Sequence, residues 1–150
     1  MANLIKILYQ LILFFIFFNF LNNTVQANNI KNSAVVFMYH KFGVSKYPST
    51  NISLDQFDEH LQEFSKPKYN VKSLANIVDT IINDDNLPAN TIGISVDDAD
   101  RSFFINAWPK LKEKGFPVTL FVTTGAIVEG SKNYLNWDEI RQLKAEGDTI

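Results

Sequence analysis

The sequence predicts an α/β fold in which helices connect the strands of a parallel sheet. Short apolar runs typical of buried strands alternate with amphipathic segments that have helical spacing. The helical segments are roughly 10 to 15 residues long, which favours parallel β/α units because parallel neighbours need a crossover connection. A closed barrel and an open doubly wound sheet are both consistent with this order.

The chain has the length and apolar content of one ordinary domain. Of its 150 residues, 46% are hydrophobic, which is enough to build a core. Lys and Arg number 14 against 16 Asp and Glu without a block of like charge, so no nucleic-acid partner is expected. Because the chain has no cysteine, disulfides and thiolate metal sites are excluded.

Residues 1–27 are predicted to be a secretory signal peptide. Lys6 precedes an almost wholly apolar stretch, and Val25-Gln26-Ala27 offers short side chains where a signal peptidase cleaves. The stretch is about 15 residues long, shorter than the roughly 20 of a membrane-spanning helix. An uncleaved N-terminal anchor is the alternative, and it would be the one contact with a membrane. Either way, the domain from Asn28 onward is expected to be exported, to the periplasm, the cell envelope or the medium.

The first half of the domain contains two predicted strands and two predicted helices. Residues 34–39 form a continuous apolar run, typical of a strand buried on both faces. After a turn-rich loop, Ser53 begins a helix with a capping box, and the helix ends before Pro67. A short strand is predicted at residues 69–72, followed by a helix over residues 74–82. The first helix carries an apolar stripe of Leu54, Phe57, Leu61 and Phe64.

The second half continues the alternation. A strand is predicted at residues 91–96 and a helix at residues 101–114, which Pro109 should kink or split after Trp108. Residues 117–123 have the strongest strand pattern of the chain.

The end of the sequence predicts an unfinished domain. Asn136 caps a last helix, Gly147 ends it, and residues 148–150 have the pattern of the first residues of another strand. A strand left there would expose an unpaired edge. Residues 28–150 are therefore expected to be the N-terminal portion of a larger domain.

Two adjacent carboxylates, Asp97 and Asp98, follow the 91–96 strand. Neighbouring carboxylates repel each other unless a cation or hydrogen bonds stabilise them. His40 follows the first strand and Thr123 the 117–123 strand, so these side chains should meet at the carboxyl edge of the sheet, where α/β folds bind ligands. The pattern predicts a metal or acid–base site.

Four segments in family order resemble the polysaccharide deacetylases, the NodB-homology group or carbohydrate esterase family four. The resemblance spans about residues 34–150. It implies a distorted β/α barrel, incomplete at the C-terminus, and a metal-dependent hydrolase that removes N-acetyl groups from an acetylamino-sugar polysaccharide. The segments are VFMYH at 36–40, SVDDA at 95–99, PVTLFV at 117–122 and WDEI at 137–140.

The resemblance also assigns roles. The family motif, usually Thr-Phe-Asp-Asp-Gly, stands here as SVDDA, which implies Asp97 as the general base and Asp98 as a ligand of a divalent metal, most commonly zinc. Ala99 replaces the family glycine, and it makes a left-handed backbone less comfortable. His40 is expected to bind substrate or the Asp97 region, or else to make a structural hydrogen bond.

The family's second motif, which supplies two histidine ligands, would follow residues 147–150 and is absent. His40 and His60 are in the wrong places to replace it, and His60 is expected on the surface of the first helix. Because catalytic zinc sites typically have three protein ligands, the 150-residue chain itself is expected to be inactive.

Two other interpretations remain. In a phosphatase-type aspartate pair, Asp98 would be the nucleophile, with Asp100 its partner and Ser102 near the expected threonine, but such motifs usually follow the first strand rather than the third. The other is an exported, non-catalytic glycan-binding relative with the same fold.

Overall fold

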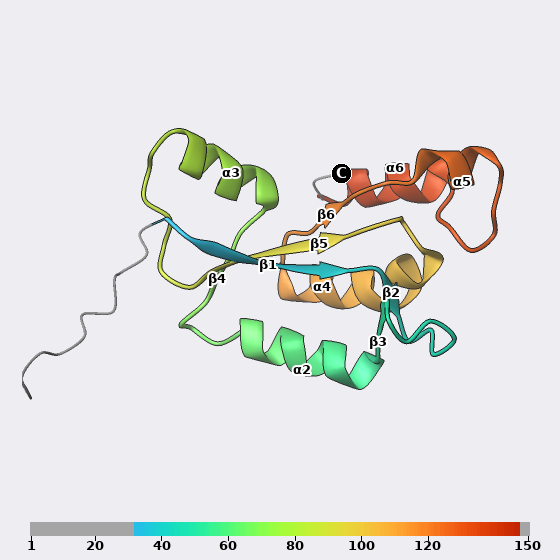
Figure 1. Cartoon of the computed structure of the whole chain (residues 1–150), viewed down its shortest axis with the longest axis horizontal. Helices are drawn as coiled ribbons and strands as arrows, with labels where there is room; N and C mark the ends of the chain where they lie inside the picture. Colours follow the sequence, from blue (N-terminus) through green and yellow to red (C-terminus); the bar gives the residue numbers. More distant parts are fainter. Residues whose placement is uncertain (1–31, 148–150) are drawn as a thin grey trace, which may run out of the picture. The chain divides into compact units, whose positions relative to one another are not determined.

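The computed structural model describes residues 32–147, which form an α/β domain around a parallel four-stranded sheet (Figure 1). β5 is central: β1 pairs along one of its edges, and β4 and β6 share the other. The predicted α/β class with parallel β/α units is confirmed. The sheet contains β1 (Ala34–Tyr39), β4 (Asn70–Val71), β5 (Thr91–Val96) and β6 (Thr119–Leu120), and β2 (Lys41–Phe42) pairs separately with β3 (Asn51–Ile52).

The helices begin largely where the sequence predicts. Ser53 and Asn136 cap α2 and α6 through capping boxes with Gln56 and Glu139. Gly115 ends α4 in the left-handed conformation that favours glycine, with φ of 64°. The helical elements are α2 (Leu54–Phe64), α3 (Leu74–Ile82), the π-helix η1 (Phe103–Ala107), α4 (Trp108–Lys114), α5 (Thr124–Val128) and α6 (Trp137–Ala145).

The helices cover both faces of the sheet. Phe37 of β1 contacts Phe64 of α2, with ring centroids 4.7 Å apart, whereas the neighbouring residue Val36 lies beside Gly93 on the face that α3 covers. Figure 1 shows α2 and α4 on one side of β1 and β5 and α3 on the other. β5 is buried at all six positions, so it forms the centre of the core.

Predictions at both ends of the chain lie outside the described residues. The signal peptide at residues 1–27 and the strand at residues 148–150 are among them. Within the described part, no helix has the length and apolar character needed to cross a membrane.

The prediction that the first strand is buried on both faces is wrong. Val35 and Met38 are each 60% exposed and Val36 is 45% exposed, while Tyr39 at the strand end is buried. The reason is position: among the described strands, β1 is an edge strand with β5 as its one neighbour. Ile81 and Ile82 of α3 are likewise exposed.

Other elements differ in length or were not predicted. The helix expected at residues 101–114 is interrupted before Trp108, where five residues form a π-helix and Pro109 lies in the first turn of α4. The strand expected at residues 117–123 is only two residues long, because its partner β5 ends at Val96. One further hydrogen bond, from the Phe121 amide to the Val96 carbonyl, follows the last strand pair. Elements β2, β3 and α5 were not predicted.

Gly93 sets the distance between β5 and α3. A Cβ at this position would lie 2.8 Å from Leu74 Cδ1 and 3.0 Å from Ile77 Cδ1. We expect Gly93→Val to lower the free energy of unfolding by about 1–3 kcal/mol through overpacking. Gly93→Ala should cost clearly less, because the two methyl groups are the mobile ends of their side chains. Urea unfolding midpoints at constant slope measure both variants, and equal losses would contradict this packing.

Candidate active site

A tight turn after β5 brings Asp97 and Asp98 to the carboxyl edge of the sheet. The Asp97 amide donates a 2.8 Å hydrogen bond to the Tyr39 carbonyl, which continues the β1–β5 pairing by one residue. Asp98 and Ala99 then adopt left-handed backbone angles, with φ of 71° and 60°. For residues other than glycine this conformation costs roughly 1–2 kcal/mol each. The Leu135 amide holds the turn with a 2.9 Å hydrogen bond to the Ala99 carbonyl.

The ends of β5 and β6 meet through a side-chain hydrogen bond. The Thr123 hydroxyl donates to Asp98 Oδ1 at 3.1 Å. Thr123 is exposed and Asp98 is half-buried. One oxygen of Asp98 thus has a neutral partner.

His40 lies beside Asp97 at the same edge. Its Nε2 is 3.9 Å from Asp97 Oδ2, which is too long for a hydrogen bond but close enough for an ion pair when the imidazole is protonated. About a quarter of each side chain is exposed (25% and 29%), so both can be reached by a ligand. His40 also lines a cavity of about 240 Å³ together with Thr50 and Asn51.

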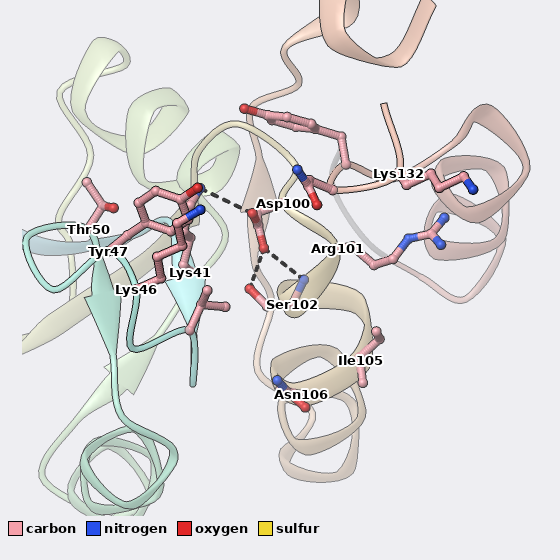
Figure 2. Close-up of a pocket in the computed structure, with 13 residues that line it drawn as sticks. Lys41, Lys46, Tyr47, Thr50, Asp100, Arg101, Ser102, Ile105, Asn106 and Lys132 are labelled. Carbon is pink, nitrogen blue, oxygen red and sulfur yellow. Dashed lines mark hydrogen bonds and ion pairs between the residues drawn. The ribbon is translucent and has the colours of Figure 1, made fainter. Parts of the chain in front are cut away.

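Asp100 is occupied in a buried polar network. Its carboxylate pairs with Lys41 Nζ at 3.1 Å and accepts hydrogen bonds from the Ser102 amide at 2.9 Å and the Ser102 hydroxyl at 2.6 Å (Figure 2). The Ser102 oxygen in turn accepts the Phe42 amide at 3.0 Å. This network ties β2 to the turn after β5. It gives Asp100 a structural role and leaves it no free carboxylate oxygen for a phosphatase-type mechanism.

The expectation that His60 lies on the surface is wrong. Its ring is half-buried, its Nδ1 is 2.7 Å from the Tyr39 hydroxyl, and it packs against Phe37 and Phe64. Burial raises the pKa of the Tyr39 hydroxyl well above its usual range. The cause is that α2 turns this side of its helix toward β1, so His60 packs against the aromatic side chains of that strand.

The described residues alone do not fit a metal centre. Within residues 32–147, no three histidine or carboxylate side chains come together as a metal-binding group. Asp98 supplies one carboxylate, whereas catalytic zinc sites typically use three protein ligands. Metal binding by Asp98 therefore stays a prediction.

A second cavity near this edge was not predicted. A cavity of about 700 Å³, within the range of ligand sites of roughly 300–1,000 Å³, has Asp100, Arg101 and Ser102 in its lining (Figure 2), and these residues follow the turn of Asp97 and Asp98 in the chain. Its walls are the segment after β2 and the loop before α6, so residues far apart in the sequence form it. Lys46 and Lys132 stand as single charges in the sequence, and no local signal indicates that they face one cavity.

Comparisons with known proteins identify the family that the chain resembles. Residues 84–150 match the family model for polysaccharide deacetylase. The resemblance predicted from the sequence is therefore confirmed. A search of curated proteins finds no match.

Solved deacetylases share the fold. They include Streptococcus pyogenes PplD in complex with acetate (23% identity, TM-score 0.69, 80% of this chain and 54% of that one). A second is the de-N-acetylase from Aggregatibacter actinomycetemcomitans (19% identity, TM-score 0.66, 76% of this chain and 51% of that one). A third is IcaB from Ammonifex degensii (24% identity, TM-score 0.64, 78% of this chain and 50% of that one). The chain thus spans about half the length of these structures, and at these identities the likeness concerns the fold.

The Lys41–Asp100 pair should be important for stability. The two side chains are only 14% and 11% exposed. We expect Lys41→Met to lower the free energy of unfolding by up to about 3–5 kcal/mol, because it leaves a buried carboxylate without its cation. The Lys41→Met/Asp100→Asn double variant should recover part of this loss.

Lys66→Met is the matched control, since its ion pair with Glu63 lies in solvent and such pairs contribute about 0–1 kcal/mol. Urea unfolding of the three variants measures the effect. An equal loss in Lys41→Met and Lys66→Met would contradict the structural role of the buried pair.

Proposed function

We propose that this chain is the N-terminal part of a deacetylase domain that hydrolyses N-acetyl groups on an amino-sugar polysaccharide and releases acetate. The observation that supports this most directly is the placement of Asp97 and Asp98. They lie within the matched residues 84–150, at the carboxyl edge of a parallel sheet, in the turn that directly follows its central strand β5. The substrate class is proposed from the family and from that placement.

In this proposal Asp97 is the general base. Its backbone is fixed by the Tyr39 carbonyl, while its side chain remains about one quarter exposed beside the His40 imidazole. A carboxylate so placed can accept a proton from an attacking water molecule, and His40 positions it or contacts the sugar. Asp98 would give one oxygen ligand to a divalent metal, with zinc the expected ion and further ligands from outside residues 32–147.

A second candidate is a non-catalytic, exported glycan-binding protein. It is favoured by one observation, namely that within residues 32–147 no three histidine or carboxylate side chains come together, whereas a catalytic zinc site typically needs three protein ligands. The two candidates differ in acetate release, since a binding protein would retain glycan without hydrolysis.

Acetate release from N-acetylglucosamine oligomers tests the proposal. The protein is assayed as encoded, with any residues that follow Ile150, in the presence of added zinc. We expect hydrolysis, and we expect Asp97→Asn to lower kcat by about 10²–10⁴-fold, because an amide cannot accept the proton. Asp85→Asn, an exposed change before the opposite end of β5, should leave the rate unchanged.

The 150-residue chain alone should release no acetate. Glycan binding without acetate release by the protein as encoded would overturn the enzyme proposal and support the binding protein. A wild-type rate for Asp97→Asn would remove Asp97 from its proposed role as base.

Export of this domain is a further part of the proposal. It is supported by the sequence of residues 1–27, in which a charged residue is followed by an apolar stretch and then by short side chains at the expected cleavage site. When the protein is expressed with its own N-terminus in a bacterial host, the exported product should begin at Asn28. Intact mass of the product measures this, and retention of residues 1–27 would indicate an anchor instead.

A further inference from the structure

The 700 Å³ cavity beside the Asp97 turn has a charge opposite to that of the whole chain. The protein has a net charge of -2, yet four of its 14 Lys and Arg residues line this one cavity together with a single carboxylate. That carboxylate, Asp100, is already neutralised by Lys41 at 3.1 Å. The remaining cations are Lys46, Lys132 and Arg101, of which Arg101 pairs with Glu139 outside the lining. A concave site with unbalanced positive charge concentrates anions.

The cations stand around the opening from two sides. Figure 2 shows Lys41, Lys46 and Tyr47 on one side, Arg101 and Lys132 on the other, and Asp100 with Ser102 between them. Lys46 is exposed, and its Nζ lies 5.4 Å from the centre of the Tyr47 ring, within cation–π range. Among the described residues, neither Lys46 nor Lys132 forms an ion pair with a carboxylate.

Arg101, which also lines this cavity, carries an unsatisfied donor. Its Nη2 pairs with Glu139 at 2.9 Å, but its Nε is buried without a hydrogen-bond partner within residues 32–147. Buried donors in folded proteins are nearly always paired, so this one indicates a missing acceptor. Tyr134 and Asn106 also line the cavity, and the Asn106 amide donates a 2.9 Å hydrogen bond to the Phe42 carbonyl.

The cavity adjoins the proposed catalytic edge. It shares Lys41 and Thr50 with the smaller cavity that His40 lines, and Asp100 is two residues after Asp98. A polymer whose reacting unit lies at Asp97 can therefore place a neighbouring unit against the basic walls.

We infer that this cavity is a subsite for an acidic substituent, a carboxylate or a phosphate, on the sugar next to the unit that loses its acetyl group. The position of that sugar rests on the proposed function, whereas binding of the anion does not. Lys46 and Lys132 attract the anion, and Tyr47 and Tyr134 offer rings to the sugar. The same charges repel a free amine, so the subsite disfavours units that are already deacetylated.

Binding of three N-acetyl sugars to the 150-residue chain tests this subsite. The probes are N-acetylmuramic acid, which carries a carboxylate, N-acetylglucosamine 6-phosphate and neutral N-acetylglucosamine. Chemical shifts in NMR titrations at low salt give each dissociation constant. We expect at least one anionic sugar to bind about five- to tenfold more tightly than the neutral sugar. The anionic sugar that binds more tightly shows whether the subsite takes a carboxylate or a phosphate. The difference should shrink at 1 M salt, where the Debye length is about 3 Å.

Two double variants make the test specific. Lys46→Gln/Lys132→Gln should abolish the preference for the anionic sugar. Lys72→Gln/Lys114→Gln removes two exposed lysines elsewhere and should preserve it. Circular dichroism confirms that both variants are folded.

Equal affinity for neutral and anionic sugars, no saturable binding of any probe, or a preference that survives in Lys46→Gln/Lys132→Gln would each overturn the inference. The measurement needs neither hydrolysis nor metal. A preference for the anion, together with no acetate release by the protein as encoded, would therefore count against the proposed enzyme alone. Hydrolysis by the protein as encoded, together with no preference, would count against the subsite alone.

Discussion

The burial of β5 is the constraint on which the rest of the structure depends. All six of its residues are buried, and it pairs with β1 along one edge and with β4 and β6 along the other. Because buried backbone groups must be hydrogen-bonded, this strand fixes the positions of the three others. Its two faces also set how closely the helices approach. Gly93 lets α3 pack close on one face, and Ile94 packs in the hydrophobic core. The carboxyl end of such a strand is a rigid place for reactive side chains.

The turn that follows β5 balances strain against packing. Asp98 and Ala99 are both left-handed, at roughly 1–2 kcal/mol each. The Ala99 methyl group is fully buried, which offsets about 0.8 kcal/mol of that strain. Backbone contacts from a distant segment also stabilise the turn. The Leu135 amide donates a hydrogen bond to the Ala99 carbonyl, and Asp100 forms an isolated antiparallel β-bridge with Tyr134. Alanine is thus tolerated where glycine would be expected, because its methyl group packs in the hydrophobic core.

Local features were predictable from the sequence and long-range ones were not. The capping residues Ser53 and Asn136 depend on neighbours within a few positions, and they lie where expected. The exposure of Val35 depends on which strands flank β1, and the orientation of His60 depends on how α2 packs against Tyr39. The basic cavity joins side chains from opposite ends of the domain, and such a grouping exists only after folding. The sequence did place Asp97, Asp98 and His40 at one edge, because each follows a strand and the carboxyl ends of parallel strands lie at the same edge of a sheet.

The strand order has a consequence for how this chain folds. β1 and β4 both pair with β5 and not with each other, so neither has its sheet partner until residues 91–96 are available. Helices such as α2 can form early from local contacts, but the sheet depends on contacts between segments far apart in the chain, which form slowly. An emerging chain therefore cannot complete this sheet until residues 91–96 are available. If the domain is exported as proposed, this order would leave the sheet unformed while the chain passes through a narrow translocation channel.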